Sequence, residues 1–187
     1  MPISRIFPVL ILTALAVAIV VPLLVAAEAA QSPKSTAEVE TKSPADHTGA
    51  SGLPVPRFVS LSSDTVNMRA GPGVRYPITC VYRRKGIPLM VMAEFEYWRK
   101  VRDGEGAEGW MHSALLRGRR MALLQGGINE LRPSPETTAP VVLRAQAGVI
   151  GQLLSCGGPW CQIILNDMRV WLPRTGLFGA LPNEEFP

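Results

Sequence analysis

Histidine, cysteine and paired carboxylates are scarce in this chain. Two histidines and three cysteines occur among its 187 residues, and charged residues make up 18% of it. Most Asp and Glu stand singly in turn-like stretches, which argues against the carboxylate pair that acid–base hydrolysis uses. Gly71-Pro72-Gly73 lacks the continuation that a phosphate-binding loop requires. We therefore expect a non-enzymatic protein that uses no cofactor.

Helical periodicity is also missing. Residues 57–124 show no sustained 3.6-residue period of apolar side chains, which an amphipathic helix would have. Short β-type runs alternate instead with turn sequences such as Lys85-Gly86. The predicted strands are 59–61, 65–68, 78–82, 87–93, 97–101 and 109–112. Short strands in this number are best closed as a small β-barrel, which removes exposed sheet edges.

The N-terminus has the layout of an export signal. Arg5 precedes an apolar run over residues 6–27, and small residues surround Ala27 and Ala29, where cleavage would occur. The run is also long enough to cross a bilayer. Residues 1–29 are thus predicted to be either a cleaved signal peptide or an uncleaved anchor helix in the membrane. Both alternatives export the rest of the chain to the periplasm or cell envelope, and the anchor would hold it at the inner membrane.

Two stretches of the chain repeat each other at a spacing of 61 to 63 residues. The matched pairs are Arg69 and Arg132, Pro72 and Pro135, Pro77 and Pro140, Gly86 and Gly148, Trp98 and Trp160, and Trp110 and Trp171. A duplicated unit punctuated by Gly and Pro indicates two small domains in tandem, 57–124 and 125–187. The second copy has predicted strands at 129–132, 141–144, 149–154, 160–165 and 169–172.

Residues 30–56, ahead of the first copy, are poor in large apolar side chains and rich in Ser, Thr, Glu, Lys, Ala and Pro. Such a segment cannot bury enough apolar surface to offset the entropy lost on ordering. We predict a disordered tether.

Positive charge gathers in the first domain. Residues 57–124 contain twelve Lys or Arg against six Asp or Glu, whereas residues 128–187 contain four against five. The excess includes Arg83-Arg84-Lys85 and the group Arg117, Arg119 and Arg120. In an exported protein such a face more often meets anionic envelope polymers or lipid headgroups than nucleic acid. A solvated face that maintains solubility would give the same pattern.

Cysteine usage suggests one disulfide. Cys156 and Cys161 bracket a turn-rich tetrapeptide between two strand-like runs, and a four-residue hairpin loop would bring them within disulfide reach. Pairing is the rule in exported proteins, and no further His or Cys stands nearby to complete a metal site. Cys80 lies in an apolar strand and is expected to pack in the core. Its sole nucleophilic option, a dyad with His112, lacks an activating setting.

Three blocks of the first copy resemble the bacterial SH3-like (SH3b) domain family. They are Val66-Asn67-Met68-Arg69-Ala70-Gly71-Pro72-Gly73, Tyr97-Trp98-Arg99-Lys100-Val101 and Glu108-Gly109-Trp110-Met111-His112. They follow the family pattern N-[VML]-R-x-G-P, W-x-x-V and G-W-[VIM]. The second copy is degenerate, because Ser134 and Glu136 replace the loop glycines. The resemblance implies an all-β fold with two tandem small SH3-like β-barrels.

The resemblance also implies a binding role. Many family members accompany cell-wall hydrolases or sit in the envelope and are thought to contact peptidoglycan or peptides. We expect a binding module of the bacterial envelope that contacts a cell-wall polymer or an envelope peptide through the first barrel, and no nucleic acid. The alternative is a structural or assembly partner that docks onto another envelope protein.

Aromatic and charged residues beside the loops of the first copy are the candidate groove of such a fold. The candidate ligand-binding residues are Arg75, Tyr76, Arg83, Arg84, Lys85, Glu94, Glu96, Tyr97 and Trp98. The repeated tryptophans are expected to fill the barrels or pin strand ends, and Trp98 is equally suited to the groove. Arg69 and Arg132 are expected to hydrogen-bond loop carbonyls.

Overall fold

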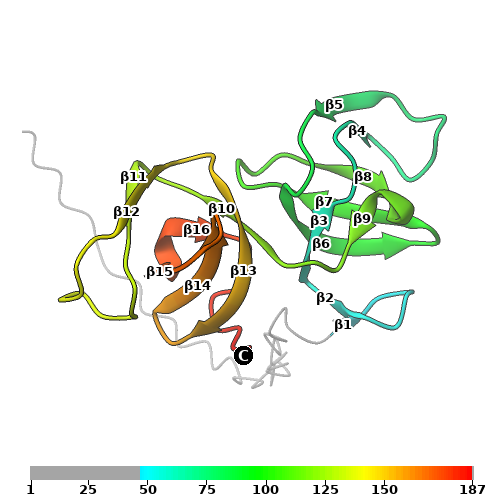
Figure 1. The fold of residues 1–187 in the computed structure, drawn as a ribbon. Coiled ribbons are helices and arrows are strands. Elements are labelled where there is room, and N and C mark those ends of the chain that lie inside the picture. The colour runs from blue at the N-terminus through cyan, green and yellow to red at the C-terminus, as the bar shows by residue number, and fades with distance from the viewer. Residues whose placement is uncertain (1–46, 187) are drawn as a thin grey trace, which may run out of the picture. The chain divides into compact units, whose positions relative to one another are not determined.

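The computed structural model describes residues 47–186 of the chain (Figure 1). The predicted signal peptide or anchor, residues 1–29, and the tether as far as residue 46 lie outside the described residues. Strands and two short 3₁₀ helices form the regular structure, so the described part is all-β, as predicted. Within residues 47–186, no helix is long and apolar enough to cross a membrane.

The first module is an antiparallel sheet with the strand order β5-β4-β8-β7-β6-β3-β9 (Figure 1). Its elements are β3 (Arg57–Leu61), β4 (Val66–Arg69), β5 (Ile78–Tyr82), β6 (Pro88–Phe95), β7 (Trp98–Arg102), β8 (Glu108–His112), the 3₁₀ helix η1 (Ser113–Leu115) and β9 (Leu116–Arg117). All six predicted strands are present, with ends that differ by no more than two residues. The short strand β9 was not predicted.

Alternation along these strands builds the first core. In β4, Val66 and Met68 are buried, whereas Asn67 and Arg69 on the opposite face are partly exposed. The same period of two places Met111 of β8 inside. The core cluster contains Leu61, Val66, Met68, Leu89, Val91, Val101 and Met111.

The second module repeats this arrangement strand for strand. Its elements are β10 (Met121–Leu124), β11 (Ile128–Leu131), β12 (Leu143–Gln146), β13 (Ile150–Gly157), β14 (Trp160–Leu165), β15 (Met168–Pro173), the 3₁₀ helix η2 (Arg174–Gly176) and β16 (Leu177–Phe178). Five of these strands form a sheet in the order β15-β14-β13-β10-β16, and β11 pairs with β12. A bridge between Arg132 and Trp171 joins this hairpin to β15. The equivalent pair in the first module is Arg69 and Trp110.

The predicted boundary after residue 124 is wrong by one strand. The sequence repeat leaves β10 in the first domain, but β10 pairs with β13 and β16 of the second module. It takes the place that β3 holds between β6 and β9. The repeat of Gly, Pro and Trp begins after this opening strand, so the sequence pattern alone does not reveal it.

The predicted C-terminal end of the disordered tether, residue 56, is also wrong, because ordered structure already begins at residue 47. β1 (His47–Thr48) pairs with β2 (Pro54–Val55), and Val55 is buried. The hairpin is attached to the first module because Glu94 accepts hydrogen bonds from the backbone N–H of Ser51 at 2.6 Å and its hydroxyl at 2.8 Å. Residues 47–56 have a composition that suggests disorder, but the Glu94 carboxylate of β6 holds them in place.

The tryptophans do not fill the cores. All four are partly exposed, and neither core cluster includes them: Trp98, Trp110, Trp160 and Trp171. Strand alternation gives the reason, because the buried neighbours Met111 and Leu172 take the inward positions of β8 and β15. The prediction that the tryptophans fill the barrels is therefore wrong. Trp110 pairs with Arg69 at the end of β4, and Trp171 pairs with Arg132 just after β11. These pairings agree with the predicted role in pinning strand ends.

Cys156 and Cys161 form the predicted disulfide. They lie opposite each other on β13 and β14, with their Cα atoms 4.1 Å apart. The hairpin is tighter than the four-residue loop that the sequence suggests, because Gly157 still pairs with Trp160. The turn consists of Gly158, which has a φ of 52°, and Pro159.

Candidate functional site

A groove of about 220 Å³ opens beside Trp98 in the first module. Its walls include Val74 from the β4–β5 loop, Trp98 at the start of β7 and His112 at the end of β8. Asn67 and Arg69 contribute from β4. This concavity, here called the Trp98 groove, therefore contains one of the predicted site residues and seven that sequence reasoning did not assign to ligand binding.

Aromatic rings gather at His112. Tyr97 is 70% exposed and stacks on the imidazole with ring centroids 6.1 Å apart, while Trp98 meets it edge-on at 5.5 Å. His112 Nδ1 accepts the backbone N–H of Ala114 at 3.2 Å, which orients the ring. Aromatic faces with an adjacent polar group suit a sugar ring or a peptide side chain. The place of His112 at the end of the Gly109-Trp110 block is the sequence feature that could have located it.

Arg69 fixes the loop that forms another wall of the Trp98 groove. Its Nη1 donates to the carbonyl oxygens of Val74 at 3.0 Å and Tyr76 at 2.8 Å. In the second module, Arg132 Nη1 donates to the carbonyl of Ala139. The predicted task of both arginines, hydrogen-bonding loop carbonyls, is confirmed.

A matching groove of about 390 Å³ lies beside Trp160 in the second module. Its walls include the counterparts of Arg69, Val74, Trp98 and His112, which are Arg132, Thr137, Trp160 and Pro173. The loss of the loop glycines has therefore not closed this groove. Its chemistry differs, because Pro173 replaces the imidazole and Pro159 stands at the position of Tyr97.

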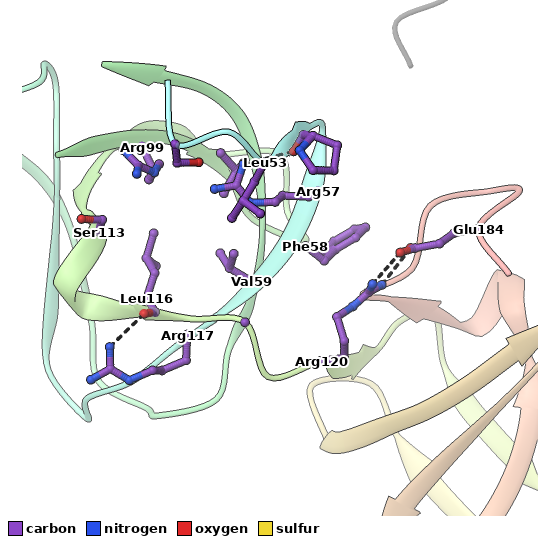
Figure 2. Close-up of a pocket in the computed structure, with 14 residues that line it drawn as sticks. Leu53, Arg57, Phe58, Val59, Arg99, Ser113, Leu116, Arg117, Arg120 and Glu184 are labelled. Atoms are coloured by element: carbon purple, nitrogen blue, oxygen red, sulfur yellow. Dashed lines mark hydrogen bonds and ion pairs between the residues drawn. The ribbon is translucent and has the colours of Figure 1, made fainter. Parts of the chain in front are cut away.

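Figure 2 shows another recess, with a volume of about 500 Å³, which is lined mainly by the first module and also by Arg120 and Glu184. Phe58, Val59 and Leu116 give it apolar walls, and arginines from several elements surround them. Two of these arginines are neutralised by one carboxylate. Arg57 Nη2 lies 2.5 Å and Arg99 Nε 3.0 Å from Glu94 Oε1.

Glu94 has a structural role between the β1–β2 hairpin and two arginines. Burial alone would raise the pKa of its carboxyl, but hydrogen bonds from Ser51 and Arg57 outweigh burial and lower this pKa below its ordinary value of 4.5. The side chain is shielded from solvent and has two guanidinium partners. These contacts give Glu94 a structural task that the sequence does not show, and ligand contact by Glu94 stays a prediction.

Arg75 and Tyr76 lie together in the β4–β5 loop, with the Arg75 guanidinium carbon 5.3 Å from the centre of the Tyr76 ring. Tyr76 covers Gly71, where a Cβ atom would approach the ring to 2.5 Å. This contact gives Tyr76 a structural task in the loop. Glu96 is exposed in the turn between β6 and β7, in the left-handed region with a φ of 48°. Ligand contact by Arg75, Tyr76 and Glu96 stays a prediction.

Arg83, Arg84 and Lys85 are exposed in the connection between β5 and β6. The structure does not bring these three cations to the Trp98 groove, so they and the aromatic residues form separate candidate surfaces.

Cys80 packs against the core cluster of the first module, as predicted, and is not part of a disulfide. His112 instead contacts Tyr97 and Trp98. In the part of the chain that the structure describes, no group of three or more His, Cys, Asp or Glu side chains is placed to hold a metal ion.

The fold and its duplicated groove define a protein of two tandem SH3-like modules. The family model described as "Bacterial SH3 domain" matches residues 62–118 and 126–179, which is more than half of the chain. The chain therefore belongs to the bacterial SH3 domain family, as the sequence motifs predicted. A comparison with curated proteins finds no match.

Among solved structures, three similar ones are NlpC2 and NlpC1 from Trichomonas vaginalis and an NlpC/P60 family protein from Bacillus cereus ATCC 10987. Their sequence identities to this chain are 9%, 12% and 13%, with TM-scores of 0.32, 0.32 and 0.30. Each match covers 70% of this chain and 51%, 48% and 58% of the other protein, respectively. The chain thus spans about half the length of these proteins.

Proposed function

We propose that this chain is a non-enzymatic, exported binding protein of the bacterial cell envelope. In this proposal it contacts peptidoglycan or an envelope peptide through the Trp98 groove of the first module. The observation that supports it best is the exposed ring of Tyr97, stacked on His112 next to Trp98. Membership in the bacterial SH3 domain family favours the same class of function.

The construction of the groove supports binding on physical grounds. Tyr97 already rests on His112, and His112 is itself held by Ala114, so these rings lose little conformational freedom when a ligand arrives. Arg69 fixes the loop that carries Val74. A preorganised groove with exposed aromatic surface can bind with modest area, because a few aromatic residues supply most of the energy in many interfaces.

The test is co-sedimentation of the purified chain with purified peptidoglycan. We expect Tyr97→Ala and Trp98→Ala each to weaken binding about tenfold, which corresponds to about 1.4 kcal/mol. Trp160→Ala is the matched control, because it removes the equivalent ring from the second module and should leave binding within about twofold. Thermal unfolding of each variant separates lost binding from lost structure. A dominant effect of Trp160→Ala would transfer the site to the second module.

Export is a separate part of the proposal, and it rests on the sequence of residues 1–29. Cell fractionation with mass analysis of the mature N-terminus tests it and distinguishes a cleaved signal peptide from a retained anchor. A full-length chain in the soluble cytoplasmic fraction would contradict both alternatives.

One observation favours the second function, an assembly partner for another envelope protein. β5 lies at the edge of the first sheet, and Ile78 and Val81 on it are 47% and 41% exposed. An edge strand with exposed apolar side chains can accept a strand from a partner. Failure of the intact chain to bind peptidoglycan, together with a cross-link from β5 to an envelope protein, would support this function instead.

A further inference from the structure

Three cationic side chains from two separate segments line a groove of about 720 Å³. Lys85 comes from the β5–β6 connection, whereas Arg117 ends β9 and Arg119 follows two residues later. Leu61 and Met121 are among its apolar walls. We call this concavity the basic groove. The fold brings together members of two positive clusters that lie far apart in the sequence.

Strand β3 fixes both sides of the basic groove. Ser60 pairs with Arg117, and its hydroxyl donates a hydrogen bond to the carbonyl of Arg119 at 2.8 Å. On the other side, the N–H of Gly86 donates to the carbonyl of Leu61 at 2.9 Å, which holds the residue next to Lys85. The three cationic residues are thus anchored through their backbone, while their side chains remain exposed.

The charges that line the basic groove are not neutralised by the protein. Arg117 donates to the carbonyls of Ala114 and Leu116, and Arg119 donates to the side-chain oxygen of Gln152. Among residues 47–186, no carboxylate forms an ion pair with Lys85, Arg117 or Arg119. Asp64 accepts the backbone N–H of Lys85 at 3.3 Å without pairing with its ammonium group.

Other cations of the first module are paired with carboxylates. Lys100 and Arg102 both form ion pairs with Glu108, at 3.0 Å and 2.5 Å. Hydrogen bonds from these two residues lower the pKa of the Glu108 carboxyl. The excess positive charge of the module is therefore not spread evenly, and part of it is concentrated on opposite sides of one groove. An anion between like charges relieves their repulsion.

We propose that the basic groove binds a linear polymer that carries phosphate groups. Guanidinium groups bind phosphate oxygens through several N–H donors, and a lysine ammonium adds a point charge. A groove of this volume, open at the surface, can take a segment with more than one phosphate. Arg84, whose guanidinium reaches the carbonyl of Gly148, places a further unpaired cation beside Lys85.

The shape of the site favours a flexible polymer over a bilayer surface. The cations surround a recess whose wall includes Ser60, a residue that is 3% exposed. A polymer chain can enter such a recess, whereas the headgroups of a flat bilayer meet its rim. This proposal does not depend on the Trp98 groove, and the two sites can be tested on different residues.

The test uses the full chain and long-chain inorganic polyphosphate, with binding measured by calorimetry over a range of salt concentrations. We expect the variant Lys85→Gln, Arg117→Gln, Arg119→Gln to bind at least tenfold more weakly and with a shallower dependence on salt. The matched control is Lys100→Gln, Arg102→Gln, Arg144→Gln, which removes the same charge from residues that are paired with Glu108 and Glu130. The control should bind within about twofold of the parent chain.

Vesicles of anionic phospholipid at the same phosphate concentration form the second arm. Weaker binding to vesicles than to polyphosphate supports the proposal. Binding to vesicles alone would overturn the polymer as the ligand. Equal losses in the two triple variants would show that net charge acts without the groove, and unchanged binding by the groove variant would place the site elsewhere. Tyr97→Ala should leave polyphosphate binding unchanged, which keeps this test separate from that of the Trp98 groove.

Discussion

Arg69 of β4 lies opposite Trp110 of β8, and this backbone pairing joins the two strands. The side chain of Arg69 then turns to the β4–β5 loop and donates to two of its carbonyls. The second module repeats the pairing with Arg132 and Trp171. The Arg and Trp residues that both copies of the repeat share therefore hold strands and loops together. The residues that differ between the copies set the chemistry of each groove.

Replacement of Arg69 by Ala should destabilise the first module by about 1.5 kcal/mol, because hydrogen bonds from a charged donor to the loop carbonyls are lost. Arg75→Ala in the same loop is the control. Arg75 is exposed and contacts the Tyr76 ring alone among the described interactions, so its removal should cost less than about 1 kcal/mol. Denaturant unfolding measures both changes. Equal effects would show that the carbonyl bonds of Arg69 contribute little.

Gly71 and Gly73 give a sharper comparison within the same loop. A Cβ atom at Gly71 would lie 2.5 Å from the Tyr76 ring, whereas one at Gly73 would approach it no closer than 3.4 Å. Gly71→Ala should therefore displace Tyr76 and cost about 1–3 kcal/mol. Gly73→Ala should be nearly neutral or slightly stabilising, because it restricts the unfolded chain. Equilibrium unfolding of the two variants decides the matter, and the reverse order would contradict the packing of Tyr76 on Gly71.

Glu94 should make the β1–β2 hairpin sensitive to acid. Its folded-state pKa is lowered, so the stability that its hydrogen bonds and ion pairs contribute is fully present above the ordinary value of 4.5. That contribution is lost as pH falls through the folded pKa, below 4.5. Amide hydrogen exchange of residues 47–56, corrected for the intrinsic effect of pH, should report a loosened hairpin in that window.

Glu94→Gln provides the control for this pH effect. It should destabilise the chain by about 3 kcal/mol, the lower end for breaking a buried ion pair, because Arg57 and Arg99 keep some exposure. Its hairpin should be loosened already at neutral pH and should not respond further to acid. A hairpin that stays protected in this variant would show that other contacts attach it.

The Cys156–Cys161 disulfide should stabilise the second module by roughly 2 kcal/mol, since it closes a short loop. The double variant Cys156→Ala, Cys161→Ala should show this loss in denaturant unfolding. Reductant should lower the stability of the parent chain to about that of the double variant and leave the double variant unchanged. Peptide mass analysis without reduction should find Cys80 as a free thiol. A disulfide that includes Cys80 would contradict the pairing.

The sequence determined the strands and their duplication because both depend on local chemistry. Alternation of apolar residues and turn-forming Gly and Pro placed all six longer strands of the first module and five of the second. The disulfide followed from spacing within one hairpin. The sequence pattern did not predict β1, β2 and β9 or, in the second module, β10 and β16. Of these, β1, β2, β9 and β16 have two residues each, too few to show a period, and β10 precedes the start of the repeat of Gly, Pro and Trp.

Tertiary structure decided which side chains share a surface. Glu94 is a buried partner of Arg57 because β3 and β6, which are distant in sequence, pair side by side. The same carboxylate holds the β1–β2 hairpin through Ser51. Strand pairing also brought His112 to Trp98, and placed Lys85 and Arg117 in one groove. Composition gives the charges and the rings, but whether an arginine meets a carboxylate, a carbonyl or solvent depends on sheet register. Register is set by the whole core, and a local sequence pattern does not contain it.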